Sequence, residues 1–231
     1  LTKENIYVLN NPILSNSQFN KFISFFGKNS FPIDCTFSDK ENLSSALERI
    51  QIESEVAVRQ GVTQIVLSDK ALTSTKLPMP MLLCVGAINT FLIKKKLRGY
   101  VSINVQSGEV LDTHSFATLI GVGATTINPY LAFDSLYQRY EKKLFGQYDF
   151  DECVGRYIKS VNAGLLKIMS KMGISVLSSY RGGCNFETVG LSRTIVNDYF
   201  PGVTSKISGI GLTGIEKKIR LIHKEAFEST D

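Results

Sequence analysis

A positively charged turn is the first place in this sequence where residue types and spacing suggest chemistry. Arg181 and Gly182 follow the β-branched run Ile174–Leu177, which we expect to form a strand. Backbone N–H groups at a strand end that leads into a helix attract anions, and an arginine adds positive charge and two further donors. The turn is therefore a candidate anion- or phosphate-binding site. The alternative is that Arg181 simply pairs with Glu187.

A second turn with polar side chains lies at residues 107–109. Ser107, Gly108 and Glu109 come directly after Tyr100–Val105, whose composition predicts a strand. In parallel α/β folds the carboxyl ends of the strands face ligands. The turn is therefore a candidate ligand-facing segment, and the alternative is that Gly108 serves a tight turn.

Residues 209–214 match the glycine-rich pattern GxGxxG. A dinucleotide site also needs a preceding strand and an acidic residue about twenty positions further on. Thr204–Ser208 reads as a poor strand, and no suitable acidic partner follows. We therefore favour a flexible linker that enters a final helix, where Thr213 and Glu216 have the spacing of a capping box.

The elements that position these turns alternate between short β-branched runs and longer helical periods. This alternation predicts parallel βα units. Five strands at most are visible, which favours a partial or distorted βα barrel, or an open doubly wound sheet, over a closed eight-stranded barrel. The expected strands are Ile33–Phe37, Val62–Leu67, Tyr100–Val105, Thr125–Ile127 and Ile174–Leu177.

The strongest helix prediction covers Asp151–Met172, with Gly173 as its C-terminal cap. Its apolar positions recur at spacings of three and four: Val154, Ile158, Val161, Leu165, Ile168 and Met172. The last helix has a similar expected face, formed by Ile215, Ile219, Ile222 and Ala226.

Composition excludes several classes of protein. The chain has 231 residues, 43% of them hydrophobic and 20% charged, so it can bury a core and is not disordered. A net charge of +5 is mild, which argues against a nucleic-acid partner. The longest uncharged run, Leu77–Ile93, contains two prolines and is slightly short for a membrane span, so we expect a buried helix and no membrane.

The four cysteines lie far apart and form no CxxC pair, so zinc and iron–sulfur spacings are absent from the sequence. We expect buried, reduced thiols in a cytoplasmic protein and no metal site in this chain. The chain begins at Leu1 and shows no signal-peptide pattern, and we expect it to be a piece of a longer protein.

Several blocks of sequence follow one another between about Asn11 and the last helix in a recognisable order. They are Leu67–Asp69, Pro78–Leu83, Leu119–Gly121, Ile127–Leu131, Gly164–Ser175, Ser179–Gly182 and Gly209–Leu212. Together these blocks resemble the large (α) subunit of glutamate synthase. The match falls on the central domain and runs toward the start of the flavin domain.

The resemblance implies a degenerate, barrel-like central domain related to FMN-linked oxidoreductases. It divides the chain into a central α/β domain at 1–200 and, at 201–231, a linker and helix leading toward the FMN domain. In that family a glutaminase domain releases ammonia, which reacts with 2-oxoglutarate in a domain that carries FMN and a 3Fe–4S cluster. The implied partners are these two domains of the same polypeptide and, as electron donor, a small subunit or ferredoxin.

The resemblance also implies a role for this chain as a scaffold and as a wall of the ammonia channel, without catalysis of its own and without a bound cofactor. Met79 and Met81 would supply adaptable apolar side chains to that wall, and Ser107 and Tyr130 would supply polar contacts for a neutral molecule. The alternatives are that both methionines fill gaps in the core, and that the chain is a stand-alone phosphate- or flavin-binding α/β enzyme using Arg181 and Gly182.

Overall fold

The structure is a computed structural model and describes residues 6–228. Its centre is a parallel sheet in the order β1-β3-β5-β6. The strands are β1 (Ser30–Asp34), β3 (Gln64–Ser68), β5 (Ser102–Gln106) and β6 (Thr126–Asn128), and Ile13 adds a single parallel bridge beside Ile127 at the edge. Two smaller sheets pair β2 (Thr36–Ser38) with β4 (Lys76–Pro78), and β7 (Glu187–Leu191) with β8 (Thr204–Ile210).

Helices follow most of the strands, as βα units require. In chain order they are α1 (Asn16–Phe26), α2 (Leu43–Arg59), α3 (Met81–Lys94), α4 (Thr113–Val122), α5 (Tyr130–Glu141), α6 (Phe150–Lys171), α7 (Leu177–Tyr180), α8 (Arg193–Tyr199) and α9 (Leu212–Glu228). Two short 3₁₀ turns, η2 (Gly27–Asn29) and η3 (Arg98–Tyr100), precede β1 and β5.

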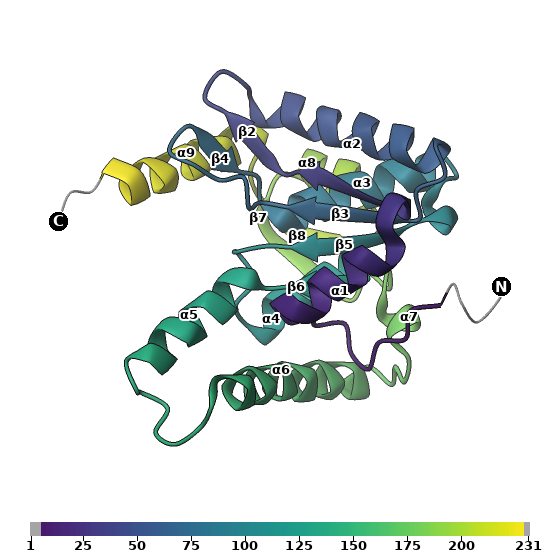
Figure 1. Cartoon of the computed structure of the whole chain (residues 1–231). Coiled ribbons are helices and arrows are strands. Elements are labelled where there is room, and N and C mark those ends of the chain that lie inside the picture. Colours follow the sequence, from purple (N-terminus) through teal and green to yellow (C-terminus); the bar gives the residue numbers. More distant parts are fainter. Residues whose placement is uncertain (1–5, 229–231) are drawn as a thin grey trace.

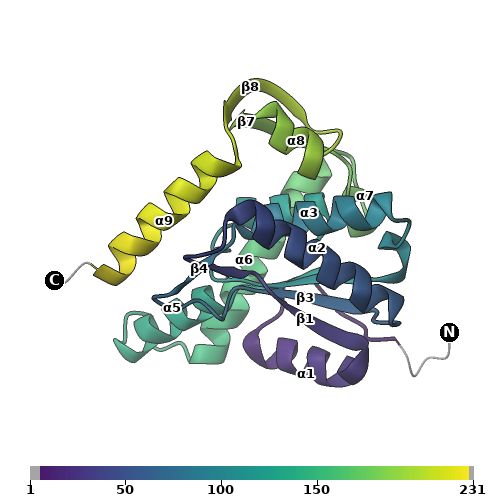
Figure 2. The same cartoon turned by 90° about the horizontal axis from the view of Figure 1, so that it is seen from above.

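The central sheet is covered on both faces (Figures 1 and 2). Alternate residues of β3 point to opposite sides: Ile65 and Leu67 join the main core under α2, α3 and α4, whereas Val66 packs with Phe19 and Phe22 of α1. A parallel sheet is normally buried in this way, which explains the continuous apolar run in the sequence.

Local sequence signals determine where the helices α2 and α6 begin and where α6 ends. The side chain of Asn42 accepts a hydrogen bond from the N–H of Ser45 at the start of α2, and Asp149 accepts from Glu152 at the start of α6. Gly173 follows α6 with a φ of 70°, a conformation that costs other residues free energy. The predicted cap at Gly173 is therefore confirmed.

Two predicted elements are wrong. Ile174–Leu177 forms no strand. The short helix α7 begins at Leu177 instead, and the side chain of Val176 is exposed. Thr204–Ile210, expected to be a flexible linker, is the strand β8, which pairs in parallel with β7. The expected strand Ile33–Phe37 is real but is divided between β1 and β2.

The last helix also differs from expectation. Ile215 and Ile219 pack against the core, whereas Ile222 and Ala226 are exposed, so half of the expected apolar face is uncovered in this chain. Glu216 does not complete a capping box with Thr213. Its carboxylate instead accepts a hydrogen bond of 2.9 Å from the N–H of Leu43, at the start of α2.

The fold is thus α/β, built from parallel βα units, as predicted. Among residues 6–228 the main sheet has four parallel strands, which makes it a partial barrel and not a closed one. The predicted division of the chain near residue 200 stays a prediction.

Candidate functional site

The carboxyl edge of the central sheet gathers polar side chains from three strands. Asp69 follows β3, Ser107 follows β5, and Tyr130 begins α5 after β6. The hydroxyl of Ser107 donates a hydrogen bond of 2.6 Å to the Asp69 carboxylate, and the N–H of Gly108 donates to the same group at 3.1 Å. Asp69 is 5% exposed and Ser107 is fully buried, so solvent does not reach this pair. We call this carboxyl edge of the sheet the rim, and the hydrogen-bonded side chains on it the rim cluster.

Burial sets the electrostatics of the cluster. Removal of Asp69 from water raises the pKa of its carboxyl group, and the hydrogen bonds from Ser107 and Gly108, together with the nearby Tyr130 hydroxyl, act in the opposite direction. The pKa of Tyr130 is raised by its burial and by the negative charge of Asp69. A side chain at position 108 would meet the Tyr130 hydroxyl at 3.1 Å, so Gly108 leaves the space in which the phenol lies.

The rim cluster continues to the start of α3 through Glu109. The N–H of Glu109 donates to the Ser107 hydroxyl at 3.1 Å, and its carboxylate accepts from the N–H of Met81 at 2.7 Å. Glu109 thereby supplies the helix cap that Pro80, with no side-chain donor or acceptor, does not provide. Ser107, Tyr130 and Met81, which the sequence analysis named separately, therefore belong to one connected rim.

The two methionine side chains point inward. Met79 and Met81 are each 1% exposed and both belong to the main hydrophobic core. The N–H of Met79 donates to the carbonyl of Cys35 at 2.8 Å, which ties the loop after β4 to the end of β1. Both side chains are thus core residues, and the backbone of Met81 is hydrogen-bonded to Glu109 of the rim.

The rim is built to hold a shape. Ser107 donates its hydroxyl proton to Asp69 and accepts from the N–H of Glu109, so its only donor is used within the rim. His223, one of the two histidines, contacts the carbonyl of Thr73 at 2.8 Å, and the other, His114, is exposed on α4. Neither histidine hydrogen-bonds to this serine or aspartate, so the rim cluster holds no Ser–His–Asp arrangement among residues 6–228.

Sequence reasoning included Glu109 in the candidate turn at 107–109 but missed Asp69 as a member of this site. Asp69 is the first residue after a buried strand, and that position is the available signal, because polar residues at the carboxyl ends of parallel strands converge. It also missed a polar ladder on the α1 side of the sheet, where Gln106 donates to Asn128 at 3.1 Å and Asn128 to Asn16 at 2.9 Å.

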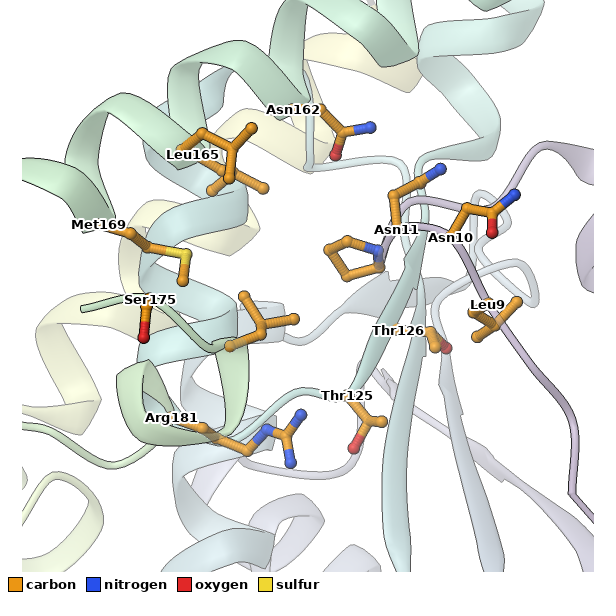
Figure 3. A pocket seen from close by; sticks show the side chains of 13 residues that line it. Leu9, Asn10, Asn11, Thr125, Thr126, Asn162, Leu165, Met169, Ser175 and Arg181 are labelled. Carbon is orange, nitrogen blue, oxygen red and sulfur yellow. The ribbon is translucent and has the colours of Figure 1, made fainter.

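Arg181 lies elsewhere, at the amino-terminal end of β6. It lines a cavity of about 490 Å³ between α6, α7, the segment 9–12 and Thr125 (Figure 3). Gly182 does not line it: its N–H donates to the carbonyl of Gly121 at 2.8 Å, so it is not available to an anion there. Glu187 pairs with Lys206 at 2.7 Å and not with Arg181.

Residues 6–228 hold no metal-ligand group, no helix suited to span a membrane and no disulfide. Among them, no three His, Cys, Asp or Glu side chains are grouped to hold a metal ion. None of the helices they form combines the length and hydropathy needed to cross a bilayer. All four cysteines are free, and Cys184 is exposed, contrary to the expectation that every thiol is buried.

Fold and site together define a class: an α/β domain of parallel βα units in which side chains after the strands hydrogen-bond to one another. The model of the glutamate synthase central domain matches residues 2–192. The chain therefore belongs to the glutamate synthase central domain family.

Relatives agree with this assignment. The chain is 46% identical over 229 residues to the glutamate synthase [NADPH] large chain of Azospirillum brasilense, covering 98% of this chain and 15% of the relative. It is 43% identical to the glutamate synthase [NADPH] large chain of Bacillus subtilis, covering 94% and 14%. The ferredoxin-dependent glutamate synthase of Pyropia yezoensis is 40% identical, over 81% of this chain and 13% of the relative. The chain thus spans about one seventh of the length of these relatives.

Among solved structures, the chain is similar to flavocytochrome b2 variants with sulfite or pyruvate bound. Their TM-scores are 0.48 and 0.49, at 16% and 12% identity. They cover 67% and 83% of this chain, and 39% and 45% of the flavocytochrome chains. Likenesses of this size carry no inference about function.

Proposed function

We propose that this chain is the inter-domain scaffold and a wall of the ammonia channel in a glutamate synthase, an enzyme that converts glutamine and 2-oxoglutarate to glutamate. The observation that carries the proposal is the family match over residues 2–192 in a chain that spans 15% of its relative from Azospirillum brasilense. The chain contributes structure to that enzyme, and by itself it is inactive.

The rim supports a guiding role. Ammonia must travel as the neutral molecule, because ammonium is not a nucleophile. Asp69 is buried and its charge is met by donors from Ser107 and Gly108, so the rim presents satisfied hydrogen bonds and no isolated carboxylate that would hold ammonium. Tyr130 is half-buried and carries the hydroxyl that a passing neutral molecule would meet. In the core, Met79 and Met81 supply apolar, unreactive side chains.

The cofactors implied by the family do not fit this chain. Residues 6–228 contain no grouped ligands for an iron–sulfur cluster. The glycine-rich stretch 209–214 forms no phosphate cradle, because Gly209 is packed against the backbone of Gly190 in the neighbouring strand. We therefore assign the FMN and the 3Fe–4S cluster to another part of the parent enzyme. The packed glycine also argues against a stand-alone flavin-binding enzyme.

The partners follow from the same proposal. The chain connects the glutaminase and FMN domains of one polypeptide, with the division near residue 200 marking the approach to the FMN domain. The names of the two relatives that are 46% and 43% identical favour a large chain that works with NADPH through a small subunit, and ferredoxin is the alternative donor. We expect the parent enzyme to be cytoplasmic.

The proposal is tested by leakage of ammonia from the intact enzyme. With glutamine and 2-oxoglutarate present, ammonia released into solution is measured for each glutamine hydrolysed. The variant Ser107→Ala loosens the rim, and we expect it to raise the leaked fraction several-fold. A leaked fraction equal to that of the wild type, in a variant that folds normally, overturns the channel-wall role.

A further inference from the structure

The cavity at the amino-terminal end of β6 has two chemically different ends and an apolar wall. Figure 3 shows the guanidinium of Arg181 beside Thr125 at one end, and Asn11 and Asn162 at the other. Leu165 and Met169 form the wall between them. A volume of about 490 Å³ is within the range of small-molecule sites.

Arg181 is a half-buried cation at one end of this cavity. Its Nε is buried and has no hydrogen-bond partner among the described residues. Burial lowers the pKa of its guanidinium, and within residues 6–228 no carboxylate counteracts this effect. Arg181 is half-buried and lines the cavity, so an anion there would meet the accessible nitrogens of the guanidinium and form charge-assisted hydrogen bonds with them.

A second arginine increases the positive charge of this region. Arg98 is held by Asn89 at 2.6 Å and by the carbonyl of Gly123 at 2.9 Å. Burial and the charge of Arg181 lower the pKa of Arg98 to about 10. The two guanidinium groups thus repel each other, and an anion next to Arg181 would relieve that repulsion.

We propose that this cavity binds a small organic carboxylate, with its carboxylate on Arg181 and its aliphatic part against Leu165 and Met169. The planar guanidinium matches two carboxylate oxygens, and one cation balances one negative charge. The apolar wall favours an anion with a hydrocarbon body over inorganic phosphate. Thr125 and the distant Asn11 and Asn162 supply neutral polar contacts.

The test uses the 231-residue chain, which supplies all the residues of its main hydrophobic core between Ile13 and Phe200. Methionine methyl groups labelled with ¹³C report binding, since Met169 lines the cavity and Met79 and Met81 lie in the main core. Hexanoate is the probe, hexanamide is its neutral counterpart, and inorganic phosphate is the anion without a hydrocarbon body. A Met169→Leu variant assigns the reporting signal.

We expect hexanoate to shift the Met169 signal to saturation while the Met79 and Met81 signals stay in place. Arg181→Gln should weaken hexanoate binding at least ~10-fold, which corresponds to about 1.4 kcal/mol. Arg139→Gln, the same change at an exposed arginine, should alter the affinity for hexanoate less than ~2-fold, because exposed charges contribute little. Hexanamide should bind at least ~10-fold more weakly than hexanoate, because it lacks the charge.

Three results would overturn the proposal. The first is no saturable shift of Met169 by hexanoate. The second is equal binding of hexanoate and hexanamide to the wild-type chain, which needs no variant to fold. The third is binding of inorganic phosphate as tight as that of hexanoate, which would show that the apolar wall takes no part.

Discussion

The hydroxyl of Ser107 donates a 2.6 Å hydrogen bond to the carboxylate of Asp69, which lies 38 residues earlier in the chain. This contact joins the ends of β3 and β5, and through Glu109 it reaches the start of α3. A short bond to a buried charged acceptor is among the stronger hydrogen bonds in proteins. The carboxyl edge of the sheet is therefore fixed by this pair.

Asp69 should make stability depend on pH in a defined direction. Burial raises its pKa above the ordinary 3.8, so its contribution is fully present below that pH and is lost as pH rises through the raised value. Asp69→Asn removes this dependence. The difference in unfolding free energy, wild type minus variant, should therefore decrease between pH 4 and pH 7 in urea titrations.

Asp198→Asn provides the control for this measurement, because Asp198 is exposed. The difference in unfolding free energy between the wild type and Asp198→Asn should not change over the same pH range. If the Asp69→Asn difference grows with pH, then hydrogen bonds dominate over burial at Asp69 and the sign assigned here is wrong.

Two adjacent leucines of α6 test which face of that helix is buried. Leu165 is 4% exposed and Leu166 is 65% exposed. Leu165→Ala should cost about 2–5 kcal/mol of unfolding free energy, because it leaves a cavity in the core. Leu166→Ala should cost no more than about 0.5 kcal/mol, as expected for a surface position. Equal midpoints in thermal unfolding would contradict the orientation of α6.

Glu216 links the last helix to α2. Its carboxylate accepts from the N–H of Leu43 and pairs with Arg220 at 2.9 Å. Glu216→Ala should cost about 0.5–2 kcal/mol, the range of a lost helix cap, and the exposed Glu225→Ala should cost far less.

The hydrogen bond to Leu43 lowers the pKa of Glu216, so its stabilisation is present above the ordinary 4.5 and is lost as pH falls through the lowered value. The difference between wild type and Glu216→Ala should therefore narrow in acid. A difference that stays constant down to pH 2 would mean that the carboxylate charge is irrelevant to this link.

Two glycines in the pattern GxGxxG test whether this stretch is needed for the packing of β8 against β7. A Cβ at Gly209 would collide with the carbonyl of Gly190, whereas a Cβ at Gly211 would meet nothing closer than 4.0 Å. Gly209→Ala should destabilise by about 1–3 kcal/mol through overpacking, and Gly211→Ala by much less. If both substitutions leave the unfolding midpoint unchanged, β7 and β8 do not pair as described.

The sequence predicted those elements whose signal is local. The helix α6 repeats its apolar positions over 22 residues, and β3 is a continuous apolar run in a buried parallel sheet. Both patterns follow from the environment of a single segment, so they were recognisable without knowledge of the rest of the fold.

The elements that were mispredicted depend on distant partners. β8 is mostly exposed and rich in small polar residues, and it is a strand because β7 lies beside it. Ile174–Leu177 has β-branched residues but no neighbouring strand, so its propensity is not realised. Likewise, Ser107 and Asp69 each stand directly after a strand, which is a local signal, whereas their pairing depends on the register of β3 and β5.

The proposed passage for ammonia is tested most directly by Tyr130→Phe in the intact enzyme. The measured quantity is the ratio of glutamine-dependent to added-ammonia-dependent glutamate formation. Losing one hydroxyl beside Asp69 should lower this ratio about 5- to 10-fold, which corresponds to about 1–1.4 kcal/mol and to the loss of one ordinary hydrogen bond. Tyr137→Phe, at an exposed tyrosine of the same helix, should leave it unchanged. A Tyr130→Phe enzyme in which both rates fall in parallel, or in which the ratio stays at the wild-type value, would contradict the account.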